Sequence, residues 1–261
     1  MKCIILAAGT STRMRPLTDD IPKCLLQVGG KTILQRTIEL VASAGVEQIG
    51  IVLGYKAETV RRFVKQQFPF HRIRIILNPK YESTNNAFSL LMAREFFMSE
   101  ARRNAPLQEL LLLDSDIIFS PELLPFLFSH ESPNRLAVRV RGSHDEEEIR
   151  VKVDRDNNVV QLGKTTPMAE TYGESVGIEV FSPADAEQLF QTVEQRVRNG
   201  AGRTEFYEAA FQEMIDNGVQ LRAVDASDYP ALEIDTLDDL EIAEKVILPR
   251  IELAKGQSGR E

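Results

Sequence analysis

The chain has 261 residues and a formal net charge of −8, with 43% hydrophobic and 27% charged residues. This length and composition favour one large globular α/β domain, and the acidic balance argues against nucleic acid as the main partner, since phosphate-backbone binding needs a basic face. No apolar run approaches the roughly 18 residues of a membrane span, no signal peptide is recognisable, and two cysteines make no disulfide framework, so we expect a cytoplasmic protein without a membrane partner.

The first half of the chain predicts short apolar strands that alternate with helices. Strands are expected at 2–7, 48–54, 72–78 and 109–114, with helices at 31–44, 56–67 and 85–98 between them. Buried strands connected by helices indicate a parallel sheet that is covered on both faces. In such sheets ligands bind beyond the carboxyl ends of the strands.

After residue 134 the pattern changes to alternating or nearly alternating segments, with a turn at 156–158. Helices return near 183–198 and 204–217, followed by a strand at 219–225 and a last helix from about 236. The sequence therefore predicts a Rossmann-like, mixed and mainly parallel sheet with helices on both faces and a small β-rich extension. We expect a single domain over 1–254 and a frayed tail at 255–261.

The loop after the first strand, within residues 6–26, carries the most informative chemistry. Leu6, Ala7, Ala8 and Gly9 are followed by hydroxyls and cations, namely Thr10, Ser11, Thr12, Arg13 and Lys23. Small residues let backbone amides approach a phosphate or a base, and fixed cations suit a triphosphate. The loop is neither a P-loop nor a dinucleotide fingerprint, which disfavours a Rossmann oxidoreductase. A strand-to-helix turn with solvated arginines is the alternative.

The motif A-A-G-x-S-x-R-M-x-P-L-T-x-x-x-P-K at 7–23 resembles the signature of the nucleotidyltransferases that activate phosphorylated metabolites. Three further segments, at 78–90, 111–119 and 232–240, resemble the phosphocholine cytidylyltransferase branch, so the resemblance covers nearly the whole chain. Many sugar-specific members have Gly where this chain has Ser11. The resemblance implies a nucleotide-binding half at 1–133, an acceptor-binding half at 134–235 and a C-terminal helix at 236–254.

Two acidic pairs follow predicted strands. The resemblance aligns Asp116 with the family's metal-binding aspartate and places Asp114 among the nucleotide contacts; it brings forward Asp235, with Glu233 close behind, as further metal contacts. Mg²⁺ is the implied cofactor, because it favours oxygen ligands from one or two carboxylates together with substrate phosphates. The alternative for both pairs is capping of the helices that follow them.

The implied reaction is attack of an acceptor phosphate oxygen on the α-phosphorus of a nucleoside triphosphate, with release of pyrophosphate. Arg13, Lys23 and Asp116 are the implied catalytic residues. Thr84, Asn85 and Asn86 are candidates to contact a pyrimidine base, since an amide offers both a donor and an acceptor. Capping of the helix at 85–98 is the alternative for this segment.

The acceptor half offers candidates rather than a motif. Arg141, Lys152 and Lys164 are candidate phosphate contacts, and the segment 173–181 resembles the family strand that lines the acceptor pocket, which brings Glu174 forward. Tyr172, Tyr207 and Tyr229 are candidates for an aromatic cage around a quaternary ammonium.

The sequence favours CTP as the donor and a small phosphorylated or phosphonylated acceptor such as phosphocholine. Two alternatives stay open: a sugar-1-phosphate nucleotidylyltransferase that uses UTP, dTTP or GTP, and a catalytically silent nucleotide-binding subunit. The oligomeric state is open as well, with a homodimer among the candidates.

Overall fold

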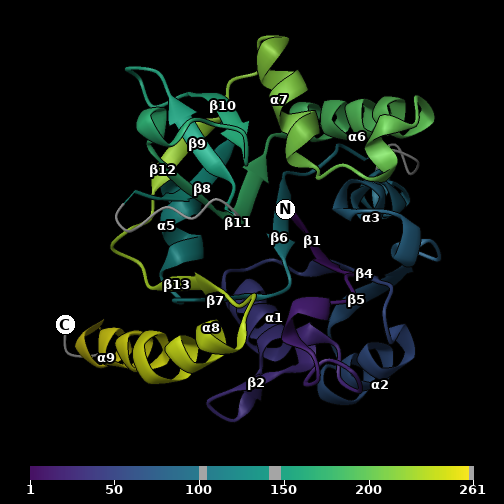
Figure 1. Cartoon of the computed structure of the whole chain (residues 1–261), viewed down its shortest axis with the longest axis vertical. Helices are drawn as coiled ribbons and strands as arrows, with labels where there is room; N and C mark the ends of the chain where they lie inside the picture. Colours follow the sequence, from purple (N-terminus) through teal and green to yellow (C-terminus); the bar gives the residue numbers. More distant parts are fainter. Residues whose placement is uncertain (100–104, 141–147, 259–261) are drawn as a thin grey trace.

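The structure, a computed structural model, describes residues 1–99, 105–140 and 148–258. A nine-stranded sheet forms the centre of this part of the chain (Figure 1). Its main path crosses, in order, β10 (Val159–Gly163), β9 (Arg150–Val153), β11 (Gly173–Phe181), β6 (Leu110–Asp114), β1 (Lys2–Ala7), β4 (Gln48–Leu53) and β5 (Arg72–Leu77). Off this path, β8 (Arg135–Arg139) pairs with β11 and with β12 (Arg222–Asp225).

The sheet is parallel in the first half of the chain and mixed in the second. β1 lies between β4 and β6 and runs parallel to both, and β4 runs parallel to β5. β11 runs antiparallel to β6, β8 and β9, so it joins the later strands to the parallel core. All six residues of β1 are buried, as expected for a central strand covered on both faces. The predicted mixed, mainly parallel sheet is confirmed.

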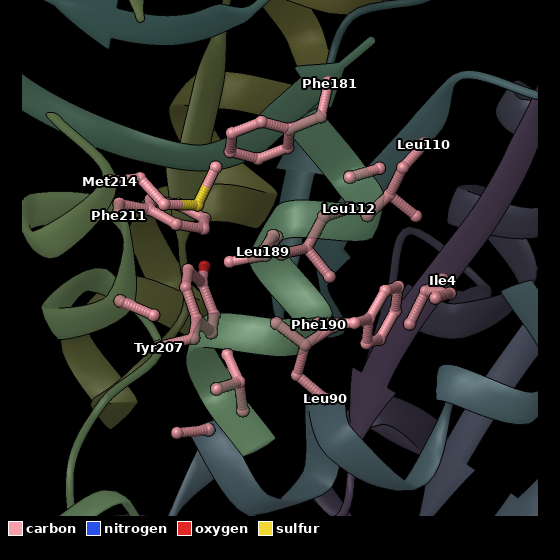
Figure 2. Close-up of a cluster of buried hydrophobic side chains, with 14 of the residues drawn as sticks. Ile4, Leu90, Leu110, Leu112, Phe181, Leu189, Phe190, Tyr207, Phe211 and Met214 are labelled. Carbon is pink, nitrogen blue, oxygen red and sulfur yellow. The ribbon is translucent and has the colours of Figure 1, made fainter. Parts of the chain in front are cut away.

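Helices cover the two faces of the sheet and pack against alternate residues of its strands. Ile5 belongs to the cluster that includes α1 (Ile33–Ser43), α2 (Ala57–Gln67) and α5 (Leu123–Ser129). Ile4 belongs to the opposite cluster, which includes α3 (Asn86–Met92), α4 (Arg94–Phe97), α6 (Pro183–Arg198) and α7 (Glu208–Asp216). Figure 2 shows this second cluster, in which Phe190 of α6 and Tyr207 before α7 lie among the leucines of β6.

Two predicted helices differ from the observed ones, and the last helix begins where it was expected. The helix expected at 85–98 is divided at Ala93 into α3 and α4. The helix expected at 204–217 begins only at Glu208, because a 3₁₀ turn at Ala201–Arg203 precedes it. The last helix begins after Thr236, which caps it with Asp239, and continues through α8 (Leu237–Ile242), a π-helical turn (Ala243–Ile247) and α9 (Leu248–Ser258). The frayed tail predicted at 255–261 is wrong for residues 255–258, which continue α9, and residues 259–261 lie outside the described residues.

A small second sheet brings the two acidic pairs together. β7 (Ile117–Phe119) runs antiparallel to β13 (Ala231–Glu233), and Glu233 is the register partner of Ile117. The backbone N–H of Ile234 donates to the carbonyl of Asp116 at 2.9 Å. Strands of three residues fix this register although residues 120–230 separate the two segments, and they place the 232–240 segment beside the end of β6.

No helix in the described part of the chain combines the length and the apolar character that crossing a membrane requires.

Candidate active site

A cavity of about 670 Å³ lies beyond the carboxyl ends of β1 and β6. Its loop end is formed by the segment from Ala7 to Lys23 and by three carboxylates, Asp116, Glu233 and Asp235, which we call the acid triad. Its α7 end is formed by Arg139, Lys164, Glu174, Phe206 and Glu208. Most of the predicted site residues line this cavity, namely Leu6, Ala7, Ala8, Gly9, Ser11, Arg13, Lys23, Thr84, Asn85, Asn86, Asp114, Asp116, Glu174, Glu233 and Asp235.

The loop that follows β1 is shaped by its own backbone and by two hydroxyl contacts. A Cβ added at Gly9 would meet nothing within 4 Å, so packing of the protein itself leaves open space there. Ser11 has a φ of 50°, in the left-handed region that glycine adopts without strain, which is the position where many sugar-specific members have Gly. Thr18 Oγ1 donates to the carbonyl of Ser11 at 2.8 Å, and Tyr55 Oη donates to the carbonyl of Thr18 at 2.9 Å. These contacts hold the loop beside the cavity.

Lys23 lies between two members of the acid triad. Its side chain is 9% exposed, and Nζ donates to Asp116 Oδ2 at 2.7 Å and to Asp235 Oδ1 at 2.6 Å. Arg13 reaches the other oxygen of Asp235 at 2.9 Å. Two predicted cations from the start of the chain and two predicted carboxylates from its middle and its end therefore form one cluster.

The acid triad has the donor set of a divalent-cation site. One carboxylate oxygen from each of its three residues lies within 4.8 Å of the others. The second oxygen of Asp116, Oδ1, is buried and has no hydrogen-bond partner in the described residues. Three carboxylates with one unsatisfied oxygen suit Mg²⁺, so these residues fit the predicted metal.

The pKa values of this cluster follow from its geometry. Burial alone would raise the pKa of Asp235, but the charge and hydrogen bond of Lys23, with the charge of Arg13, hold it below its ordinary value. Burial alone would lower the pKa of Lys23, but the two carboxylates raise it. Desolvation and then the charges of Asp116 and Asp235 raise the pKa of Glu233, although its side chain reaches the solvent of the cavity. The triad thus holds one carboxyl that gains a proton easily when no further cation is near.

Asp114 lies at the end of β6 but is not part of the triad. Its Oδ2 accepts a hydrogen bond from Tyr207 Oη at 2.9 Å. Burial, followed by the charges of Asp116 and Glu208, raises the pKa of Asp114 well above its ordinary value. Gly177, with a φ of 73°, lets β11 pass close by, since a Cβ there would lie 3.1 Å from Asp114 Oδ2. Asp114 therefore belongs to the buried floor of the cavity.

The 84–86 segment combines the capping alternative with a place in the cavity wall. Asn85 Oδ1 accepts from the backbone N–H of Asn86 at 2.8 Å and caps α3. Asn86 Oδ1 accepts from the backbone N–H of Tyr207 at 2.9 Å, and Thr84 Oγ1 donates to the carbonyl of Lys80. In the described part of the chain, the side-chain nitrogen of Asn86 has no hydrogen-bond partner and remains available to a ligand.

The α7 end combines two predicted acceptor contacts, Glu174 and Lys164, with groups that sequence reasoning did not single out. Arg139 Nε donates to Glu174 Oε1 at 2.5 Å, and Arg139 Nη2 donates to Glu148 Oε1 at 3.3 Å. Lys164 Nζ lies 5.2 Å from the centre of the Phe206 ring. The remaining wall residue is Glu208 at the start of α7. Its signal in the sequence was only that of an acidic residue in the first turn of a helix, which the helix dipole explains without any ligand.

Several predicted acceptor contacts lie elsewhere. Lys152 pairs with Glu170 on the exposed side of β9 and does not line the cavity. The ring of Tyr172 is partly buried and packs against the core cluster that includes α6 and α7. Arg141 lies outside the described residues, and Thr10 is next to the cavity wall in the chain but not part of it.

The expected tyrosine cage is not formed. Tyr207 is 1% exposed, and its hydroxyl is bound to Asp114 in the floor. Tyr229 stacks on Phe126 with ring centres 4.5 Å apart, away from the cavity. Because each ring is packed against protein, the three tyrosines present no shared face to a ligand.

Comparison with known proteins places this geometry in a family. Residues 2–228 match the model of the family described as Nucleotidyl transferase. The choline-phosphate cytidylyltransferase of Streptococcus pneumoniae is 38% identical over 99 residues, which are 36% of this chain and 40% of that protein. The CTP:phosphoglutamine cytidylyltransferase of Campylobacter jejuni is 26% identical over 258 residues, 93% of this chain and 98% of that protein.

A solved structure supports the fold along the whole chain. The inositol-1-phosphate CTP transferase from T. maritima superposes with a TM-score of 0.78 and 21% sequence identity, over 96% of each chain. The family match covers both halves of the domain, including the loop after β1 and the end of β6. The chain therefore belongs to the nucleotidyl transferase family.

Proposed function

We propose that the protein is a Mg²⁺-dependent cytidylyltransferase, which transfers CMP from CTP to a small phosphorylated or phosphonylated acceptor and releases pyrophosphate. The observation that carries the proposal is the cluster at the loop end, where Lys23 and Arg13 meet Asp116 and Asp235 beside the small residues that follow β1. Cations for phosphates and carboxylates for a metal ion lie within one cavity.

The proposed chemistry needs charge neutralisation and alignment more than it needs a base. The second pKa of a phosphate monoester is about 6, so the acceptor oxygen is already anionic near neutral pH. The bound metal would withdraw charge from phosphate oxygens, and Asp116, Asp235 and Glu233 are the residues that would hold it. Arg13 and Lys23 would bind the triphosphate and the leaving pyrophosphate.

Lys23 has two roles in this proposal. In the protein without ligands it compensates the charges of Asp116 and Asp235. When a metal ion on these carboxylates takes over that compensation, the ammonium group of Lys23 is the group that can turn to phosphate oxygens. The lysine then follows the charge that develops on the leaving group, since its compact ammonium sits on a flexible stem.

The choice of CTP is supported by the relatives and by the 84–86 segment. The two relatives described above are both named as cytidylyltransferases. The cavity wall offers the amide of Asn86 to the edge of a base, and Ala7, Ala8 and Gly9 leave room for a flat ring. The printed substrates of these relatives differ, so the acceptor needs an argument from this chain's own residues.

A screen of pyrophosphate release tests the proposal. CTP, UTP, dTTP, GTP and ATP are each combined with phosphocholine, phosphoethanolamine, 2-aminoethylphosphonate, glycerol phosphate, inositol phosphate and sugar 1-phosphates, with and without Mg²⁺. We expect release with CTP and Mg²⁺ only. A clear preference for UTP, dTTP or GTP would replace the cytidylyl assignment with that of a sugar-1-phosphate nucleotidylyltransferase.

A further inference from the structure

Glu208 is a buried carboxylate in the wall of the cavity. Its residue is 8% exposed, and Oε2 is fully buried without a hydrogen-bond partner in the described part of the chain. The backbone before it is fixed, because the N–H of Tyr207 donates to Asn86 at 2.9 Å. A buried carboxylate oxygen without a donor destabilises a protein unless a ligand supplies that donor.

Four of the other carboxylates of the wall have a cation within 4.0 Å. Arg139 contacts both Glu174 and Glu148 at the α7 end. Lys23 joins Asp116 and Asp235 at the loop end. Glu208, by contrast, forms no ion pair within 4.0 Å among the described residues, although the charge of Lys164 acts on it from a longer distance.

A purely structural role for Glu208 does not account for its environment. A glutamate in the first turn of a helix is normally solvated and is stabilised by the helix dipole. Here burial outweighs that benefit and raises the pKa of Glu208 to about 7, with the charge of Glu233 adding to the rise and that of Lys164 opposing it. A group that destabilises the protein in which it is buried is a candidate for function.

We propose that Glu208 binds the ammonium group of the acceptor, and that this acceptor is a phosphorylated or phosphonylated amine with N–H bonds rather than a polyol, a sugar or a quaternary amine. The inference rests on the proposed function, whose acceptor class it specifies. Glu208 and the acid triad line the same cavity, so one ligand in that cavity can lie against both.

The lining of the α7 end favours N–H bonds over methyl groups. A carboxylate oxygen that lacks a donor is satisfied by an N–H group, whereas a quaternary ammonium has none to give. A quaternary ammonium prefers aromatic faces instead. The aromatic residue of the α7 end is Phe206, and the ammonium of Lys164 already lies over its ring. The tyrosines expected to form a cage are packed into the protein.

The wild-type enzyme tests the inference without any substitution. Its kcat/KM with CTP is measured for three acceptors that differ only at one end: phosphoethanolamine, 2-hydroxyethyl phosphate and phosphocholine. A site built around an unpaired hydrogen-bonding group rejects an analogue that lacks the partner, so we expect phosphoethanolamine to exceed each of the others by at least about tenfold. Equal values, or a preference for the hydroxyl or the quaternary compound, would overturn the inference.

Glu208→Gln tests the residue itself, because it removes the charge but keeps the shape. Its kcat/KM for phosphoethanolamine should fall by at least about tenfold, while that for 2-hydroxyethyl phosphate changes by less than about threefold. The matched control is Glu179→Gln. Glu179 is 1% exposed and also has an unpartnered Oε2, but it does not line the cavity. The control should keep the wild-type ranking of acceptors.

The outcomes separate the two proposals. If the enzyme uses CTP only with acceptors that have no cationic group, such as 2-hydroxyethyl phosphate, the proposed function stands and the role of Glu208 is overturned. Loss of the ranking in both variants would also overturn it, since the effect would then come from the buried acids in general. No release from CTP with any acceptor would overturn the proposed function and the inference together.

Discussion

At the loop end of the cavity, two carboxylates share one buried lysine and one of them also binds an arginine, whereas at the α7 end Glu208 has no ion-pair partner among the described residues. Both ends are acidic, and both lie beyond the carboxyl ends of the same sheet. At the loop end, the two aspartates are compensated within the protein. At the α7 end, Arg139 compensates Glu174 and Glu148, and the proposal leaves Glu208 for a ligand. In the proposed reaction, the cations of the loop end match the anionic triphosphate of the donor, and Glu208 matches the cationic end of the acceptor.

The compensated end is also the end that must rearrange. Lys23 holds Asp116 and Asp235 together in the absence of ligands, so the proposed binding of metal and nucleotide would exchange one set of ionic contacts for another. The α7 end needs no such exchange, because nothing has to leave Glu208 before an ammonium group binds. Substitutions at the two ends should therefore differ in kind as well as in size.

The largest effect is expected at the loop end, for Asp116→Ala. This change removes a proposed metal ligand and one partner of Lys23. Turnover should fall by at least about a hundredfold, the scale of losing a main transition-state charge contact. Steady-state kinetics with and without EDTA will measure it. Wild-type turnover in the variant, or no effect of EDTA on the native enzyme, would show that the metal assignment is wrong.

Lys23→Ala should have the next largest effect and should act on the chemical step. We expect turnover to fall by at least about tenfold with a smaller change in the KM for CTP, since the proposed contact strengthens as charge develops on pyrophosphate. Lys31→Ala is the control, because Lys31 pairs with Glu39 outside the cavity. A rise in KM with unchanged turnover would mean that Lys23 holds only the ground state.

The loop end was predictable because its residues are carried by contiguous motifs. Arg13 and Lys23 lie in one loop after a recognisable strand, and the two acidic pairs lie beside other recognisable strands. Sequence reasoning did not provide the contact between Lys23 and Asp235, which are 212 residues apart. That contact depends on the pairing of β7 with β13, and strands of three residues leave no periodic signal.

At the α7 end, Glu174 and Lys164 were predicted from the sequence, but Glu208 was not. Glu208 looks like an ordinary first-turn acid until the packing of α7 against β10 and α6 is known, and that packing is what buries it. Tyr172, Tyr207 and Tyr229 share a region of sequence but face different parts of the core. The local sequence pattern predicts whether a segment forms a helix or a strand. Contacts between segments that are distant in the sequence decide whether a side chain faces the cavity.

Measuring the free energy of unfolding sharpens the comparison, because removing a charge should change it in opposite directions at the two ends. Burial raises the pKa of Glu208 from 4.5 to about 7, so the folded state holds this proton more tightly than the unfolded state does. The native protein is therefore progressively destabilised as the pH rises through this range. Glu208→Gln should increase the free energy of unfolding at pH 8 by on the order of 2 kcal/mol, and by little at pH 4.

Urea denaturation of the wild type, Glu208→Gln and Asp116→Asn at pH 8 and pH 4 will check this. Asp116→Asn should instead destabilise the protein at pH 8, because it leaves the buried ammonium of Lys23 with one carboxylate partner. If both variants changed stability in the same direction at pH 8, the two ends would not differ in charge compensation.

The smallest effect is expected for Tyr207→Phe, at the floor that joins the two ends. The hydroxyl of Tyr207 donates to Asp114 at 2.9 Å, and the rest of the ring is packed between Phe211 and the core. The variant keeps this packing and leaves one buried oxygen of Asp114 without its donor. The free energy of unfolding should fall by about 1 kcal/mol, and turnover by less than about fivefold.

The pattern across acceptors decides what Tyr207 does. Because its hydroxyl faces Asp114 and not the wall at Glu208, the variant should lower kcat/KM for phosphoethanolamine, phosphocholine and 2-hydroxyethyl phosphate by the same factor. Tyr229→Phe is the control, since that ring stacks on Phe126 away from the cavity and the change should affect none of the three. A selective loss with phosphocholine alone would restore Tyr207 to the acceptor wall, and would require the floor to open when ligand binds.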